Sequence, residues 1–439
     1  MAETLAQLGF NQTGFDEFLE RCANEPQWLR DQRISAWEQF DHMEWPDRQS
    51  EEWTRTDIRL FKLDNFSLSA EDNFADSLCP TSLLTKNVAL AGSNVSRNSQ
   101  TCETQLAPEW AQQGVLFGSL AKLAREHSEL IQPYLMKHAF QTDYDRFAAL
   151  HAAWWTSGTL LYVPKGVVVD QPLHTLAGLS NGATDLAHTL VILEDGAEAT
   201  LLSELISDEP SAGGFHCGGV ELIVGKRAHL RYVNLQNWGE KVWHFAHQKA
   251  IIESDASLQW TVAAIGSRLA KVNQHVALVG EGANSQVNGV MFTEGKQHHS
   301  YHTLQHHIAP HCHSDFLYKA ALQDNSRTVW RGMIKVDATA QKTDGYQRND
   351  NLLLSHKARA DSIPGLEIEA DDVRCTHGST TGKIDEELIF YAMCRGFTRR
   401  EATRAIVTGF FQQIFDRITI DSVRDAMGLA IAGKVQEYE

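Results

Sequence analysis

One pattern recurs between about residue 190 and residue 360, and it constrains the fold more than any other feature of the chain. Two apolar residues precede a short polar turn, the turn ends in alanine, and a strand-like run follows. Successive alanines lie 20 to 31 residues apart. The clear copies end at Ala197, Ala228, Ala256 and Ala283, and weaker copies end at Ala309, Ala338 and Ala358. A repeat of this length indicates stacked coils, because one coil cannot bury its apolar face alone.

The segments between these turns alternate in polarity with a period of two. Leu258 and Trp260 fall on one face of such a segment, and Gln259 falls on the other. This alternation indicates strands, and no helical pattern lies between them. We therefore predict a mainly β fold whose core, over residues 156–382, is a solenoid. A β-sandwich with uneven loops is the alternative, but the length of the repeating region favours the solenoid.

Helical regions flank the predicted solenoid on both sides. Residues 1–155 are polar and mostly helical in composition, and Pro133 interrupts their longest helical stretch. Residues 383–439 again show helix signals, among them Thr398 and Glu401 in the arrangement of a capping box. We expect three regions: an N-terminal helical region, the solenoid core and a C-terminal helical domain.

The C-terminal region contains an apolar stripe at helical spacing. Val407, Phe411, Ile414 and Ile418 follow one another at intervals of four, three and four residues, which places them on one face of a helix. A stripe of this kind must pack against something. It packs back onto the solenoid or it contacts a partner protein, and the sequence leaves both arrangements open.

Composition limits the class of protein. The net charge of −17 argues against nucleic-acid binding, since phosphate contacts need a basic face. No run approaches the ~18 consecutive apolar residues of a transmembrane helix, and the first residues have no features of a secretory signal. Seven scattered cysteines without a CxxC pair indicate a reducing environment. We expect a cytoplasmic chain whose partners are proteins, with no membrane contact.

A glycine-rich segment at residues 378–384 is similar to a nucleotide-binding P-loop. It is one residue short, and it lacks the Ser or Thr that would follow Lys383. Such a loop could not hold phosphates and also present a hydroxyl to magnesium. We therefore expect that this chain binds no nucleotide.

Seven histidines gather in the short segment 298–313. They are His298, His299, His302, His306, His307, His311 and His313. A structural metal is one interpretation, because imidazole binds zinc, iron and copper and a strand would carry His311 and His313 on one face. A polar ladder of hydrogen-bonded histidines along a solenoid face is the other. The ladder is favoured, since no acidic or Cys residues that could complete a metal site follow at fixed spacing.

Cys375 and His377 are the residues best placed for chemistry. In a strand their side chains point to the same side, with Cα atoms about 6–7 Å apart, and Arg374 points to the opposite side. A thiolate and an imidazole can hold one metal ion or one cluster edge, and a Cys–His nucleophile is a second option. Taken alone, such a pair is most often a buried cysteine beside a hydrogen-bonded histidine.

Several segments around this pair and near the N-terminus form a recognisable set. They are residues 340–347, 351–355, 366–382, 385–391 and 395–396, together with residues 46–58. The set resembles the SufB/SufD family of iron–sulfur cluster assembly scaffold proteins. Within that family, the Cys-x-His-Gly of residues 375–378 resembles the SufD branch, whereas SufB-like chains carry an acid–His–acid run there and are usually longer.

The resemblance implies a right-handed parallel β-helix between the two helical regions, and it implies partners. A SufD-type chain pairs with SufB through the β-helices. Its C-terminal helical domain, here with the stripe that begins at Val407 and Phe411, holds the ABC-type ATPase SufC. Cys375 and His377 would lie at the SufB–SufD junction. His377 is the better candidate ligand of a nascent iron–sulfur cluster, which SufB completes with a thiolate.

The same resemblance implies a mechanical role. SufC dimerises on binding ATP and pulls the C-terminal helical domains, so that the junction opens, and the chain itself would catalyse nothing. A reduced flavin can accompany such complexes, but the sequence shows no flavin motif. Cys394 lies where a polar residue is expected in a helix, and the sequence assigns it no role.

Two other functions are alternatives. A SufB-like scaffold that acts as a homodimer would share the same motifs, and the sequence leaves open whether the chain self-dimerises without SufB. A β-helix lyase or hydrolase of acidic polysaccharides would carry carboxylates along a groove. That enzyme would need export, for which the sequence shows no signal.

Overall fold

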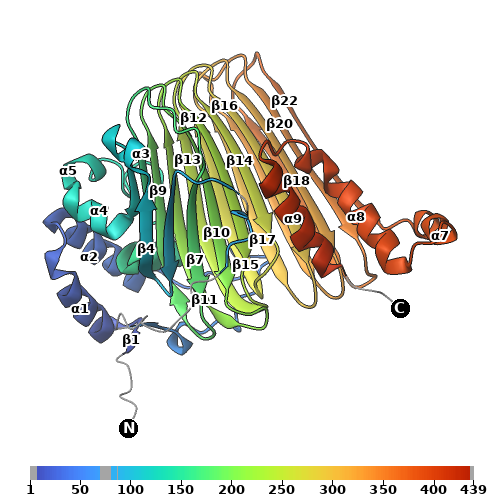
Figure 1. Cartoon of the computed structure of the whole chain (residues 1–439), viewed down its shortest axis with the longest axis horizontal. Coiled ribbons are helices and arrows are strands. Elements are labelled where there is room, and N and C mark those ends of the chain that lie inside the picture. Colours follow the sequence, from blue (N-terminus) through green and yellow to red (C-terminus); the bar gives the residue numbers. More distant parts are fainter. Residues whose placement is uncertain (1–6, 70–80, 87, 436–439) are drawn as a thin grey trace, which may run out of the picture.

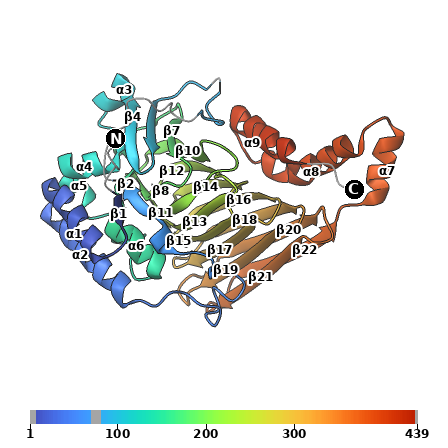
Figure 2. The same cartoon turned by 90° about the horizontal axis from the view of Figure 1, so that it is seen from below.

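The computed structural model describes residues 7–69, 81–86 and 88–435 of the chain. Two ten-stranded sheets lie face to face, and helices cover one end and part of an outer face (Figures 1 and 2). Through the middle of the chain, consecutive strands belong to opposite sheets, and strands two apart in sequence pair in parallel. Each coil therefore gives one strand to each sheet, which confirms the mainly β solenoid that the repeat predicts.

The two sheets are called sheet 1 and sheet 2. In spatial order, sheet 1 contains β22 (Arg374–Lys383), β20 (Asp344–Leu353), β18 (His313–Leu322), β16 (Asn284–Thr293), β14 (Ser257–Ala264), β12 (His229–Asn237), β10 (Glu198–Ser207), β7 (Leu173–Leu179), β3 (Gly92–Arg97) and β4 (Gln100–Leu106). Sheet 2 contains β21 (Arg359–Ile368), β19 (Arg327–Val336), β17 (His298–His307), β15 (Leu269–Leu278), β13 (Lys241–Ile252), β11 (Gly213–Val224), β9 (Ala187–Leu193), β6 (Ser157–Val163) and β5 (Leu116–Ser119), with β8 (Thr184–Asp185) paired to β11. A separate two-stranded sheet joins β1 (Gln7–Gly9) and β2 (Ser67–Ser69).

The helices lie before and after the solenoid. They are α1 (Gln12–Arg21), α2 (Gln27–His42), α3 (Pro108–Gln112), α4 (Leu120–Glu126), α5 (Ser128–Ile131) and α6 (Arg146–Trp154) on the N-terminal side, with short 3-10 turns η1 (Cys22–Asn24) and η2 (Leu63–Asn65). On the C-terminal side they are α7 (Glu386–Cys394), α8 (Arg399–Phe415) and α9 (Asp421–Lys434). The predicted capping box of Thr398 and Glu401 begins α8.

A small residue inside each turn explains the alanine repeat. Ala197, Ala228, Ala256 and Ala283 each lie directly before a strand of sheet 1 and are buried. The residue before each of them has a positive φ, so the chain reverses within a single tight turn. The four clear copies of the repeat are therefore equivalent positions of successive coils.

The positions predicted for the three weaker copies of the alanine repeat are wrong. The equivalents in the next coils, by strand register, are Cys312, Thr343 and Val373, not Ala309, Ala338 and Ala358. Counted at these positions, the coil length is 27 to 31 residues, which is more regular than the spacing of the alanines. Cys312 and Thr343 are themselves small enough for the inside of the turn, so alanine alone does not mark it.

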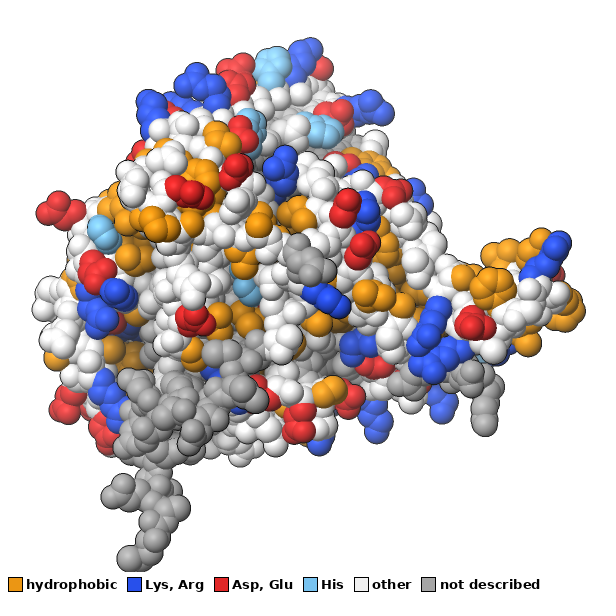
Figure 3. Space-filling model, viewed as in Figure 1, with side chains coloured by type: hydrophobic (Ala, Val, Ile, Leu, Met, Phe, Trp, Pro, Cys, Tyr) orange, Lys and Arg blue, Asp and Glu red, His pale blue; other side chains and the backbone are white. Residues whose placement is uncertain are grey.

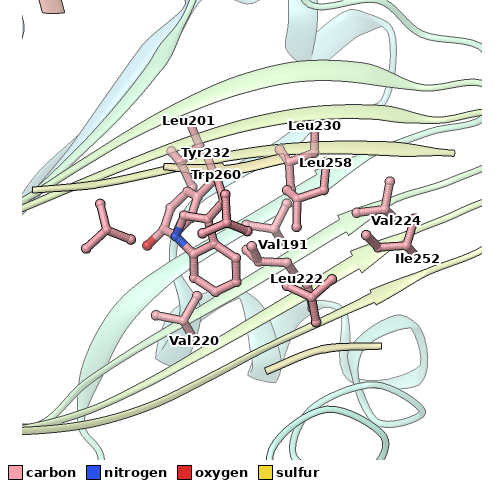
Figure 4. Packing of buried hydrophobic residues seen from close by; sticks show 14 of the residues in the cluster. Val191, Leu201, Val220, Leu222, Val224, Leu230, Tyr232, Ile252, Leu258 and Trp260 are labelled. Atoms are coloured by element: carbon pink, nitrogen blue, oxygen red, sulfur yellow. The ribbon is translucent and has the colours of Figure 1, made fainter. Parts of the chain in front are cut away.

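Apolar side chains from both sheets meet between them and form the core (Figure 4). Leu258 and Trp260 of β14 belong to the same cluster as Val220 and Leu222 of β11, and each is at most 8% exposed. The outer face of β14 is buried as well, because Ala263 packs beneath the C-terminal helices. Burial on both faces is why the polar alternation is incomplete in the central strands.

The N-terminal region contains more β-structure than the sequence predicts. β3 and β4 extend sheet 1 and β5 extends sheet 2, and each extension ends in an antiparallel pair. The longest predicted helical stretch of the N-terminal region, which Pro133 was expected to interrupt once, is divided among β5, α4, α5 and α6. These strands are short, and their pairing with the solenoid, rather than any periodicity of their own, decides their conformation.

Two of the three C-terminal helices pack on the outer face of sheet 1 (Figure 2). Val407, Phe411 and Ile414 of α8 are at most 1% exposed, and Ile418, just beyond α8, is 5% exposed. They share a cluster with apolar residues of the solenoid such as Phe292. Of the two arrangements that the sequence left open, the structure has the stripe packed back onto the solenoid.

The structure bears on two predictions made from composition, one about transmembrane helices and one about disulfides. No helix in the described part of the chain is long and apolar enough to cross a membrane. No disulfide joins the six cysteines found within residues 7–69, 81–86 and 88–435, and Cys79 lies outside the described residues.

Candidate functional site

The C-terminal end of the solenoid is open. Among the described residues, β21 and β22 are the last strands of their sheets, and each pairs with a neighbour on one side only. Leu366 and Ile368 of β21 continue the rows of the fully buried Ile334 and Val336, yet they are 38% and 40% exposed. Free edge N–H and C=O groups, together with exposed core-facing side chains, form a surface suited to pairing with another chain.

Cys375 and His377 lie on β22 at this open end. Their register partners in β20 are Gly345 and Gln347, and the Gln347 side chain is fully buried in the core. Both side chains therefore belong to the core-facing row, as the sequence predicts, and Arg374 lies on the other face of the strand. Cys375 is half-buried and His377 is exposed.

The surroundings of Cys375 favour the protonated thiol. Burial raises the pKa of the Cys375 thiol above its ordinary value of 9.0, and the charge of Asp344 raises it further. The backbone N–H of Gly345 donates to the sulfur and opposes this rise in pKa. A thiol of this kind becomes a thiolate when a metal ion or another positive group approaches it.

Cys375 and His377 supply two donor atoms of a metal site and no more. Within the described ranges, no group of three or more His, Cys, Asp or Glu side chains is placed to hold a metal ion. Iron–sulfur clusters are usually held by four protein ligands. A cluster at this position would therefore need ligands from a second molecule, and the open end is where a second molecule can reach the pair.

The seven histidines of residues 298–313 are divided among the two faces of sheet 2, the turn that follows, and the first residue of β18 in sheet 1. His299 and His307 point into the core, and burial lowers their pKa values to about 4 and about 3. His306 lies on the outer face, 2.9 Å from Asp337, and stacks on His275 with ring centroids 5.9 Å apart. Within the described chain, the hydrogen bonds of the rings in this segment join them to Gly266, Asp337 and Ser314, and none joins two of its histidines, so the predicted ladder of histidines hydrogen-bonded to one another is wrong.

His311 and His313 do not share a strand face. His311 has a φ of 60° and lies in the turn, and β18 begins only at His313. Cys312 between them is buried, with its Sγ 3.3 Å from the carbonyl oxygen of Gly280. The interpretation that put both rings on one strand face is wrong, because the left-handed turn residue separates them.

A group of exposed apolar side chains in the C-terminal domain lies on α7 and just after it, and Leu429 of α9 is exposed as well. Side chains of α7 and the residue that follows Gly396 are between 44% and 69% exposed: Leu388, Phe390, Tyr391, Met393 and Phe397. Figure 3 shows apolar side chains gathered on the projection at this end of the molecule. The four stripe residues, three on α8 and Ile418 just beyond it, could contact a partner only if this segment left the solenoid.

Sequence reasoning missed a buried polar network near the other end of the solenoid. His151 Nε2 lies 2.9 Å from His188 Nδ1, and His188 Nε2 lies 3.0 Å from Glu221 Oε1. Glu221 also accepts hydrogen bonds from the backbone N–H groups of Met136 and Phe140. The network fastens the N-terminal region to β11. Its members are far apart in the sequence, so no local pattern could have identified them.

These features define a β-solenoid protein that carries its candidate chemistry on an end surface and not in a groove along its side. Two family models match the chain, one for the SUF system FeS cluster assembly SufBD core domain over residues 176–410, and one for the SufBD protein N-terminal region over residues 16–175. The chain belongs to the SufBD family of iron–sulfur cluster assembly proteins. This assignment does not favour the polysaccharide-cleaving alternative.

Individual relatives span nearly the same length. The chain is 27% identical over 436 residues to the iron–sulfur cluster assembly protein SufD of Bacillus subtilis, covering 98% of this chain and 99% of the relative. It is 27% identical over 403 residues to a SufBD family protein of Staphylococcus epidermidis, covering 90% and 86%. It is also 26% identical over 411 residues to SufB of Bacillus subtilis, covering 90% and 87%. These nearly equal identities do not separate the two branches.

Proposed function

We propose that this chain is the SufD-type, non-catalytic scaffold subunit of a SufBCD-type complex, and that its open end forms half of a nascent cluster site with SufB. The observation that carries the proposal is the uncapped coil of β21 and β22. It presents free strand edges and the pair of Cys375 and His377 on one surface. The Cys-x-His-Gly form of residues 375–378 supports the SufD branch over the SufB-like alternative.

Pairing of two open ends would continue both sheets across the junction. The exposed Leu366 and Ile368 would be buried, and the strand edges would be satisfied. The nascent cluster is then cargo held between the subunits. His377 is the principal ligand on this side because it is exposed, whereas Cys375 is partly held against Gly345. SufB would supply the matching thiolate.

The short connection between β22 and α7 supports a mechanical link to an ATPase. β22 ends at Lys383 and α7 begins at Glu386, so two residues separate the strand that carries the site from the helix with the exposed apolar surface. In this proposal α7 contacts SufC. The buried stripe that begins at Val407 anchors α8 and is not the contact itself. ATP-driven closure of two SufC copies would then pull on the ends of the last coils.

Co-expression with SufB and SufC tests assembly and the cluster site separately. All three chains should purify as one complex, and His377→Ala should leave that complex assembled. Cluster formation, followed by the iron and acid-labile sulfide content of the complex and by a cluster-dependent reporter enzyme in cells, should fall by roughly tenfold or more, because a ligand is lost.

His356→Ala is the matched control, since His356 is exposed in the turn before β21 and lies outside the core-facing row of the open end. Normal cluster formation in the His377→Ala complex would remove His377 from the mechanism. A chain that purifies only as a self-dimer while SufB is present would favour the homodimer alternative.

A further inference from the structure

The open end of the solenoid is divided into an apolar half and a polar half. In the apolar half, Leu366 and Ile368 of β21 continue the buried rows of the preceding coil. Cys375 packs against the cluster that contains their register partners, Ile334 and Val336. The end of β21 and the start of β22 therefore lie together and form one apolar surface.

The polar half is built around Asn351, which lies just inside the last coil and is 4% exposed. Its side-chain Nδ2 donates to Ser362 Oγ of β21 at 3.0 Å and to Thr381 Oγ1 of β22 at 3.3 Å. Ser362 Oγ donates in turn to Asn349 Oδ1 at 2.5 Å. Ser379 is the register partner of the fully buried Asn349, so its side chain also faces the core side of β22. The start of β21 and the end of β22 thus form a polar surface.

Two hydroxyl groups of this polar half are left to solvent. Ser379 and Thr381 are both exposed. Within the described chain, the Ser379 hydroxyl has no hydrogen-bond partner, and the Thr381 hydroxyl accepts a bond from Asn351 but donates none. A second chain that covers the open end removes the water from both groups, so each hydroxyl then needs a partner from the covering chain.

We propose that Ser379 and Thr381 set the register of the junction with SufB. The SufB coil that covers them would carry hydrogen-bonding side chains over these two residues and apolar side chains over Leu366 and Ile368. This inference rests on the proposed function and names the chemistry of its partner surface. The rest of β22 specifies a register weakly, because polar strands that contain glycine allow slippage.

Register matters for the shared cluster site. A slip of two residues keeps every side chain on its own side of the sheet, but it moves the strand by ~6.6 Å. Metal–ligand distances tolerate changes of only about 0.2 Å. A slipped SufB strand would therefore take its thiolate out of reach of His377. It would also bring apolar side chains over the two hydroxyls, and each hydroxyl buried without a partner disfavours that register by roughly tenfold.

Ser379→Ala combined with Thr381→Val tests the proposal, because it removes both hydroxyls and nearly preserves the size of the side chains. Thr376→Val is the matched control, since Thr376 is exposed on the opposite face of the same strand. Each full chain also carries Gly382→p-benzoylphenylalanine, at a position where an added carbon meets nothing within 4 Å. The complex with SufB and SufC is purified and irradiated, and mass spectrometry identifies the cross-linked SufB residues.

In the otherwise unchanged chain and in Thr376→Val, the cross-links should fall at one position of a SufB strand. In the double variant SufB should still co-purify, and the share of cross-links displaced by two residues should rise by about tenfold or more. The iron and acid-labile sulfide content of that complex should fall as well. Because only co-purified complexes are analysed, the readout reports folded chains.

Two results would overturn the inference. One is a double variant with a single, unchanged cross-link position and full cluster content. The other is loss of SufB from the double variant, since the hydroxyls would then supply affinity and not register.

The outcome is separable from that of the proposed function. A wild-type chain that does not co-purify with SufB refutes the scaffold role itself. A wild-type chain that assembles and builds clusters, together with a double variant that behaves identically, refutes the register role alone.

Discussion

The two ends of the solenoid differ in how the parallel stacking stops. At the N-terminal end, β4 and β5 run antiparallel to their neighbours, and Trp110 and Phe117 fill the end of the core. At the C-terminal end, β21 and β22 stay parallel, and within the described chain Leu366 and Ile368 remain partly exposed. One end of the molecule is completed by its own chain, and the other has the form of a surface that a second chain completes.

The chemistry of the two edge strands follows the same division. β4 carries exposed polar and charged residues such as Glu103 and Gln105, which discourage pairing with another strand. β22 is rich in Thr, Ser and Gly and has charged residues only at its two ends, Arg374 and Lys383. An edge without central charges leaves its backbone groups free for a partner strand.

The largest effect on the free energy of unfolding is expected from a substitution at the closed, N-terminal end of the solenoid. Phe117 is 5% exposed and belongs to the core cluster, so Phe117→Ala should lower the free energy of unfolding by about 3–5 kcal/mol through lost burial and the cavity left behind. Urea denaturation at neutral pH measures this. A loss below about 1 kcal/mol would mean that the closed end is not part of the cooperative core.

An intermediate effect on the free energy of unfolding is expected from His299, which is buried between the two ends. Burial lowers the pKa of His299 to about 4, below the ~6.5 of an unfolded chain. The unfolded chain takes up a proton first, so the stability due to neutral His299 is complete above about pH 6.5 and is lost as the pH falls toward 4. This group alone should cost about 2 kcal/mol between pH 7 and pH 5.

His299→Gln should remove that part of the pH dependence, because a glutamine amide can still donate to the carbonyl of Gly266, as the His299 ring does at 2.6 Å. Urea denaturation at the two pH values gives the difference. His356→Gln, at an exposed position, serves as the control. If His299→Gln shows the same difference as the wild type, the proton uptake occurs elsewhere.

The smallest effect on stability is expected at the open end. Leu366 is 38% exposed in the single chain, so Leu366→Ala should lower the free energy of unfolding of the isolated chain by less than about 1 kcal/mol. The same substitution should weaken assembly with SufB far more, which co-purification measures. A stability loss as large as that of Phe117→Ala would show that the end is already covered by self-association, and sedimentation would identify that dimer.

How far the sequence predicts this protein depends on whether a feature is local. Ala197 and its three clear equivalents could be recognised because each coil repeats the same turn. Cys312 and Thr343 could not be recognised as equivalents from the sequence, since only strand register shows that they occupy the position of the alanines. The N-terminal strands β3 to β5 were missed for the same reason, because their pairing with the solenoid is not encoded in a period.

The candidate site shows the same limit. Period-two alternation was enough to place Cys375 and His377 on one side of a strand and Arg374 on the other. The sequence did not show that this strand is the last of its sheet, or that Gly345 of the neighbouring strand lies beside the thiol. Both facts depend on which coils stack on one another.

The sequence by itself determined the stacked coils, the helical domain after residue 383 and the apolar stripe of α8, since each depends on the spacing of side chains along a strand or helix. Only the tertiary structure decided that the stripe is buried on sheet 1, that α7 carries a group of exposed apolar side chains, and that one end of the solenoid stays open. The physical reason is that spacing defines which side chains share a face. What lies against that face depends on contacts between residues far apart in the chain.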